Sequence, residues 1–215
     1  MIIETEVNPF HCLYQDALYF HTQSHLALGR SETEASRLAR AALLFYVSSS
    51  EAFVHQAAIE LGHADLFGLI ADPTRPIPLF EAWRFLPAIM GVSGNSQDIE
   101  QPPWPQFAEL LNLRESWAYP GIPSSRKAYY RGVSSGFDPL EPHQVPKGLD
   151  LSREDLAYPK TGLPRDPYSL RPRHLDTVRG IVDSSIASLD HRVGGALTRD
   201  NRHRREVTRF LEENS

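Results

Sequence analysis

The sequence has little of several features that would assign it to a common class of protein. It has one cysteine, Cys12, among 215 residues, so no disulfide can form within the chain and we expect a reducing compartment. No apolar run approaches the roughly 18 residues that a membrane-spanning helix needs. The N-terminus has no basic segment followed by an apolar run, so we expect no signal peptide. These absences predict a cytoplasmic protein with no membrane partner.

Several motifs for catalysis and cofactor binding are also missing. The sequence has no glycine-rich phosphate loop, no Ser-His-Asp order and no zinc-finger spacing. Charge of one sign is not in excess either: 22 Lys and Arg face 27 Asp and Glu, a net charge of −5. That balance argues against a protein that coats nucleic acid without sequence preference. We therefore expect no cofactor and no resident metal.

The residues that are present indicate an all-α fold in a single domain, 1–215. Hydrophobic residues make up 41% of the chain, enough for a sizeable core. Apolar residues recur at helical spacing, and glycines and prolines mark the ends of the helices. A kink or break is expected at Pro87. The predicted helices are Phe10–Leu28, Ser31–Leu61, Leu79–Met90, Pro105–Tyr119 and Arg173–Val193.

The second predicted helix carries two apolar seams instead of one. Ser31 and Glu34 form a capping-box pattern at its start, and Gly62 follows its end. A helix that is apolar on two sides is covered by neighbours on both, so we expect it to lie centrally. One seam comprises Ala35, Leu38, Ala42, Phe45, Ala52 and Ile59, and the other comprises Leu44, Val47, Val54, Ala58 and Leu61.

Two segments of the chain differ from the rest in amino-acid composition. Residues 120–172 hold nine of the 17 prolines and five of the 13 glycines, so we expect an irregular insertion. Its many apolar side chains predict that it is largely ordered. The tail, 196–215, is basic and is expected to be a short charged helix. Arg199, Arg202, Arg204 and Arg205 are weak nucleic-acid-binding candidates, although interleaved glutamates disfavour contact with RNA.

Two charged residues stand on apolar stripes. Glu51 lies on the second seam of the second helix, and Arg114 lies on the buried stripe of the helix that starts at Pro105. Burying either charge alone would cost several kcal/mol. We therefore predict that they pair across the two helices. The alternative is that each side chain reaches the edge of the bundle.

These segments resemble a known family. Residues 42–54, ALLFYVSSSEAFV, look like the long central helix of HEPN domains, helical bundles of prokaryotic defence and stress systems. Residues 109–120, ELLNLRESWAYP, look like the helix that carries the signature arginine of that family, and Ser188–Gly195 is similar to the end of its closing helix. The resemblance covers about half of the chain and implies a HEPN-like bundle.

The resemblance also implies which residues could act. In HEPN ribonucleases an arginine and a histidine, helped by a polar residue of the central helix, assist attack of the RNA 2′-hydroxyl on phosphate. The matching positions here are Arg114, Tyr119 and Glu51. Tyrosine has a pKa near 10 and is a poor general base at neutral pH. We therefore expect a catalytically degenerate binding or regulatory module. As the family often does, it would pair as a homodimer, and an antitoxin is one protein partner to expect.

Two other readings of the function remain open. The first is an active, metal-independent endoribonuclease that uses an altered Glu51, Arg114 and Tyr119 site. The second is a structural assembly protein without a ligand. An open basic cleft around Arg114 would favour the ribonuclease, whereas a sealed Glu51–Arg114 pair would favour the other two.

One pair of histidines has the spacing of metal ligands. His21 and His25 lie one helical turn apart, a separation that can chelate a metal ion. They also continue the apolar stripe of the first helix, and the sequence offers no matching pair elsewhere. We therefore interpret them as histidines of the core or its rim.

Overall fold

The computed structural model describes residues 2–60, 62, 78–89, 100–118, 130–133, 136–140, 144, 157–192 and 206–211. This part of the chain is mostly helical, as the sequence predicts, and it also contains two short antiparallel ribbons. None of its helices has both the length and the apolarity that crossing a bilayer requires.

The first two helices form a long antiparallel hairpin. Helix α1 spans Pro9–Leu28, and Asn8 caps it by accepting a hydrogen bond from the backbone N–H of His11. Helix α2 spans Glu32–Glu60. The hydroxyl of Ser31 accepts from the backbone N–H of Glu34 at 3.2 Å. Both helices were predicted within two residues of these bounds.

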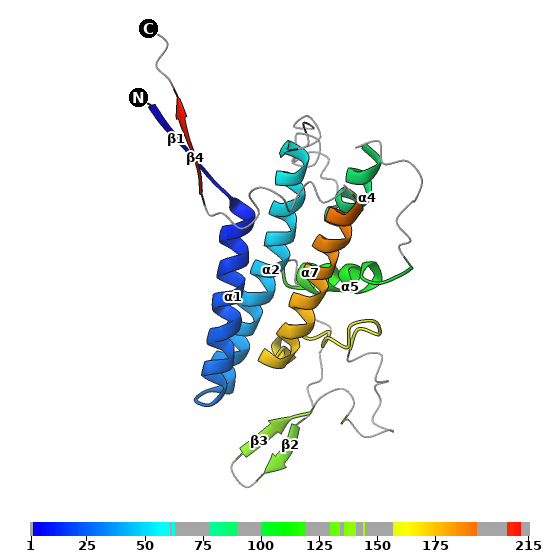
Figure 1. Ribbon diagram of the computed structural model, residues 1–215. Coiled ribbons are helices and arrows are strands. Elements are labelled where there is room, and N and C mark those ends of the chain that lie inside the picture. Colours follow the sequence, from blue (N-terminus) through cyan, green and yellow to red (C-terminus); the bar gives the residue numbers. More distant parts are fainter. Residues whose placement is uncertain are drawn as a thin grey trace.

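Helix α2 lies at the centre of the bundle, as predicted, and contacts α1, α4 (Leu79–Ile89), α5 (Trp104–Ala118) and α7 (Leu175–Arg192) (Figure 1). The two predicted seams are buried only in part. Leu44 and Ile59 are 40% and 48% exposed, whereas Ala35, Ala42, Val47, Val54 and Ala58 are buried. A row that was not predicted is buried between the seams, through Ala39, Leu43, Tyr46, Ser50, Phe53 and Ala57.

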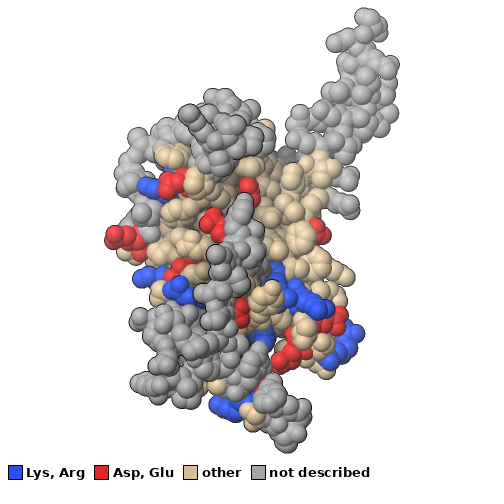
Figure 2. All heavy atoms as spheres, turned by 180° about the vertical axis from the view of Figure 1, so that it is seen from behind, with Lys and Arg blue, Asp and Glu red and all other residues tan. Residues whose placement is uncertain are grey.

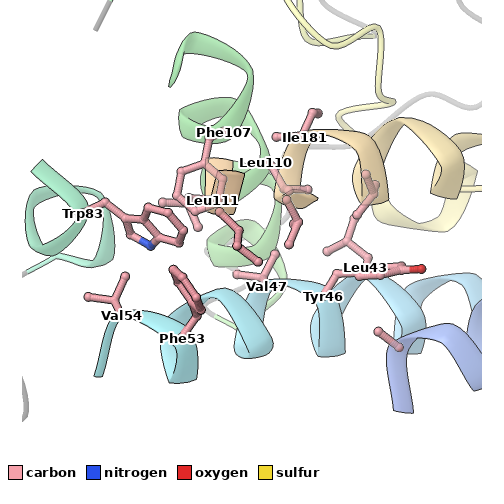
Figure 3. Close-up of a cluster of buried hydrophobic side chains, with 14 of the residues drawn as sticks. Leu43, Tyr46, Val47, Phe53, Val54, Trp83, Phe107, Leu110, Leu111 and Ile181 are labelled. Carbon is pink, nitrogen blue, oxygen red and sulfur yellow. The ribbon is translucent and has the colours of Figure 1, made fainter. Parts of the chain in front are cut away.

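Aromatic side chains fill the core where α2, α4 and α5 meet (Figure 3). Trp83 of α4 stacks on Phe53 of α2 with ring centroids 5.7 Å apart, and contacts Phe107 of α5 edge-on at 5.2 Å. Each of these large side chains is at least 96% buried. Helix α4 includes Pro87 in its last turn, so the helix is not split at that proline.

Helix α7 closes the bundle along α2. Two single 3₁₀ turns precede it, η2 (Pro167–Ser169) and η3 (Pro172–His174). All five apolar residues expected on its buried stripe are less than 5% exposed: Leu175, Val178, Val182, Ile186 and Leu189. The helix is confirmed, and it begins two residues later than predicted.

The two ribbons were not predicted. Strand β1 (Ile2–Val7) pairs antiparallel with β4 (Glu206–Leu211), and β2 (Tyr130–Val133) pairs with β3 (Gly136–Pro139). The prediction of a charged helix in the tail is therefore wrong for residues 206–211. Val207 and Phe210 there belong to a β-prone stretch that finds a partner strand some 200 residues away in sequence, and helical periodicity cannot reveal such a partner.

Candidate functional site

The residues that the resemblance marks as catalytic do not form a site among the described residues. Glu51 is partly buried on α2, and no hydrogen bond or ion pair joins it to Arg114 in the described part of the chain. The Nε of Arg114 is buried in the structure and has no hydrogen-bond partner. The predicted Glu51–Arg114 pair is therefore wrong.

The physical reason lies in the rotation of α2. The row that faces its neighbours passes through Tyr46, Ser50 and Phe53, which places Glu51 at the margin of the buried face. Its carboxylate lies near His55, one turn further along α2, where it favours the protonated form of that imidazole against the larger effect of burial. Tyr119 and the arginines at 199, 202, 204 and 205 lie outside the described residues.

The outer side of α5 is held by the chain itself. The carboxylate of Glu109 accepts hydrogen bonds from the backbone N–H of Lys160, at 3.0 Å, and of Thr161, at 2.9 Å. The turn reverses at Gly162, whose φ of 69° favours glycine, and Leu163 beyond it is 99% buried. This part of the 120–172 insertion is ordered against the helix that carries Arg114, in agreement with the prediction that the insertion is held to the core.

A different group of polar side chains gathers where α1, α2 and α7 meet. His21 of α1 is 7% exposed, and its Nδ1 lies 3.0 Å from the hydroxyl of Tyr46, which is fully buried on α2. On the other side of the ring, Nε2 of His21 lies 3.6 Å from Oδ1 of Asp176, in the first turn of α7. His25, the next turn along α1, stacks on His21 with ring centroids 5.3 Å apart.

A second pair of contacts continues this group along α7. The hydroxyl of Tyr14 donates to Oδ1 of Asp183 at 2.5 Å. Arg179, one turn before Asp183, lies 3.4 Å from its Oδ2, and Tyr14 beside it raises the pKa of that guanidinium. Tyr14 and Tyr46 contact each other edge-on, so the contacts form one network from His25 to Asp183. We call the seven residues the polar cluster: Tyr14, His21, His25, Tyr46, Asp176, Arg179 and Asp183.

The ionisation of the cluster is governed by burial. Burial lowers the pKa of His21; Asp176 opposes that effect, and His25 and Arg179 add to it. Burial, with the hydrogen bond to Asp183, raises the pKa of Tyr14 to about 12, and burial also raises the pKa of Tyr46. At neutral pH His21, Tyr14 and Tyr46 are therefore all in the neutral form.

The structure also has a separate pocket of about 430 Å³. It is bounded by the α1–α2 turn, the β2–β3 ribbon and η3. Arg131, Arg171 and Arg173 line it together with Glu32 and Asp138. Arg131 and Asp138 face each other as cross-strand partners, and Arg171 is bound to Ser36 and to two backbone carbonyls. The arginines of this pocket are therefore largely used within the fold.

The sequence had pointed to one half of the polar cluster. The four-residue spacing of His21 and His25 was recognised, but Tyr46, Asp176 and the Tyr14–Asp183–Arg179 group were missed. Asp176, Arg179 and Asp183 recur at three- and four-residue intervals on α7, a signal that ordinarily indicates a solvated face.

Comparisons with protein-family models, with curated proteins and with solved structures found no match to this chain.

Proposed function

We propose that the chain is a HEPN-like binding or regulatory module that does not cleave RNA. One observation carries the proposal: the Nε of Arg114 is buried among packed helices without a hydrogen-bond partner. An arginine that stabilises charge on a reacting phosphate must point its donors at the place where the phosphate binds. Arg114 instead has part of its guanidinium turned into the fold.

The charge of the surface supports the proposal further. The sealed Glu51–Arg114 pair that we expected of such a module is absent among the described residues, so that pair is not part of the support. Acidic and basic side chains are interspersed over the face shown in Figure 2, without a continuous basic surface among the residues described there. RNA-binding surfaces depend on concentrated positive charge, because contacts to phosphate supply most of the affinity.

The absence of a suitable proton-transfer group is the chemical reason to expect no cleavage of RNA. Tyr119 stands where the resemblance calls for a histidine, and a tyrosine pKa would have to fall by about three units to serve at neutral pH. We infer that the fold was kept while the proton-transfer group was lost. A homodimer and an antitoxin-like protein partner belong to the same proposal and rest on the resemblance.

The proposal is tested by incubating the purified chain with a mixed pool of single-stranded RNA in EDTA. We expect no cleavage that depends on Arg114, so that wild type and Arg114→Ala give the same product profile. Cleavage that disappears in both Arg114→Ala and Tyr119→Phe would refute the proposal and establish the altered ribonuclease site. A gain of cleavage in Tyr119→His would support the account of what was lost. Light scattering on the same samples tests the homodimer.

A further inference from the structure

We propose that His21, His25 and Asp176 form a binding site for a divalent transition-metal ion of the Zn²⁺ class. The three side chains can each direct one ligand atom toward a common point, since these atoms all lie within 4.8 Å of one another. They join the C-terminal half of α1 to the first turn of α7, and these two places are about 150 residues apart in sequence. The inference is independent of the proposed function, because it does not depend on whether RNA is cleaved.

The ligand types fit such an ion. Two imidazoles and one carboxylate, with a remaining position for water or a ligand, are a common donor set for zinc outside purely structural sites. Imidazole nitrogen selects zinc, copper, nickel and cobalt over magnesium and calcium, which prefer oxygen. His25 and Asp176 are exposed, so an ion held here would remain open to solvent on one side.

The most deeply placed ligand, His21, is oriented in advance. Its Nδ1 is engaged by the Tyr46 hydroxyl at 3.0 Å, which leaves Nε2 as the nitrogen that faces Asp176. Metal-ligating histidines commonly have their second nitrogen fixed by such a partner. Tyr46 is itself fully buried, so it holds the ring more firmly than a surface group could.

Only small movements of exposed side chains are needed for the three residues to coordinate an ion. Ligand atoms around a tetrahedral zinc ion lie about 3.3 Å apart, given bonds of roughly 2.0–2.1 Å. Nε2 of His21 and Oδ1 of Asp176 are already 3.6 Å apart. Side-chain rotation of the exposed His25 would bring in the third ligand. The Asp176 side chain is 79% exposed and can follow the ion.

The surrounding charges leave room for a cation. Arg179 of α7 acts on His21 as a like charge, but it lies 3.4 Å from the carboxylate of Asp183, which offsets part of its charge. Asp176 lies beside His21, so a bound cation would have a carboxylate next to it.

The competing interpretation is that His21 is an ordinary buried histidine and that His25 and Asp176 are solvated. The two interpretations differ in what His25 does. His25 is an exposed side chain whose ring contact within the described residues is with His21, so it can be replaced without disturbing the core. A structural role for His21 needs no contribution from it, whereas a metal site does.

The test is a titration of the untagged full chain, freed of metal with a chelator, with Zn²⁺ and then with Co²⁺. We expect one ion per chain, a rise in Tm on addition of Zn²⁺, and a visible Co²⁺ spectrum of nitrogen and oxygen ligation. His25→Ala and Asp176→Asn should each weaken binding by tenfold or more, and Tyr46→Phe, which changes a positioning residue, by about tenfold.

Matched controls exist in the chain. Asp16→Asn removes an exposed carboxylate from α1, and His191→Ala removes an exposed imidazole from α7 that lies about 22 Å along the helix from Asp176. Both should bind like wild type. If wild type binds no ion at micromolar Zn²⁺, or if His25→Ala binds as tightly as wild type, the site does not exist. His25→Ala keeps the test decisive even if a His21 variant fails to fold.

Discussion

Helix α5 and the α1–α2–α7 junction both bury polar groups, but only the junction pairs them. On α5 the Nε of Arg114 is enclosed without a hydrogen bond. At the junction His21, Tyr14 and Asp183 each have a partner within 3.0 Å. A buried polar group is kept at low cost only when it is paired. The family resemblance marks α5 as functional, yet the paired and chemically capable groups lie at the junction.

Among the variants that test this contrast, we expect Tyr46→Phe to have the largest effect on stability. Tyr46→Phe removes the hydroxyl that bonds Nδ1 of His21 and leaves that nitrogen buried without a partner. We expect a loss of about 1–3 kcal/mol in the free energy of unfolding, measured by urea denaturation in chelator. The double variant His21→Leu/Tyr46→Phe should be less destabilised than the sum of the single variants. Strict additivity would show that the two side chains do not interact.

A smaller effect concerns pH and His174, at the end of η3. Its Nδ1 accepts a hydrogen bond from the backbone N–H of Arg171 at 2.9 Å. Burial, with Arg173 and Arg171, lowers its pKa from 6.5 to about 4. Since the folded-state pKa is the lower one, the unfolded chain binds the proton first. Stability is therefore intact above about pH 6.5 and falls as the pH drops toward 4.

We expect His174 to account for a loss of about 1–2 kcal/mol between pH 7.5 and pH 5, measured by denaturation in chelator at each pH. His174→Gln keeps an acceptor near the Arg171 N–H and cannot titrate, so its stability should depend less steeply on pH. His21 and His55, whose pKa values burial also lowers, would supply the remaining slope. An unchanged slope in His174→Gln would show that this histidine is protonated as readily in the folded chain as in the unfolded one.

The smallest effect is expected at Arg114. Without a pair to break, Arg114→Met keeps most of the apolar contact of the side chain and removes an unsatisfied donor, so stability should stay within about 0.5 kcal/mol of wild type. The adjacent Leu113, which is fully buried, provides the reference: Leu113→Ala should cost about 2–5 kcal/mol. A loss of several kcal/mol in Arg114→Met would mean that the guanidinium is paired after all.

The helices could be predicted because their signals are local. Asn8 and Ser31 at the starts, Gly29 and Gly62 at the ends, and apolar residues at helical spacing lie within each helix or next to it. The rotation of α2 could not be predicted, because its two seams are nearly equal in apolarity and the packing of four neighbours decides between them. The sequence therefore placed Glu51 on the buried face, whereas the structure places it at the margin.

Long-range pairing set a second limit. Strand β4 forms because β1 lies beside it, and the sequence of 206–211 does not indicate that partner. For the same reason only part of the polar cluster could be predicted from the sequence. His21 and His25 share one helix, but Asp176 comes from another helix and Tyr46 from a third, and a single sequence does not report that these helices meet at those turns.

The most direct test of the claim that the chemistry of this chain lies at the junction is anomalous diffraction at the zinc edge, from crystals of the chain grown with Zn²⁺. We predict a peak between the imidazoles of His21 and His25 and the carboxylate of Asp176, and no peak at that position in His25→Ala crystals. Wild-type crystals without a peak there, or with the same peak in His25→Ala, would contradict the account.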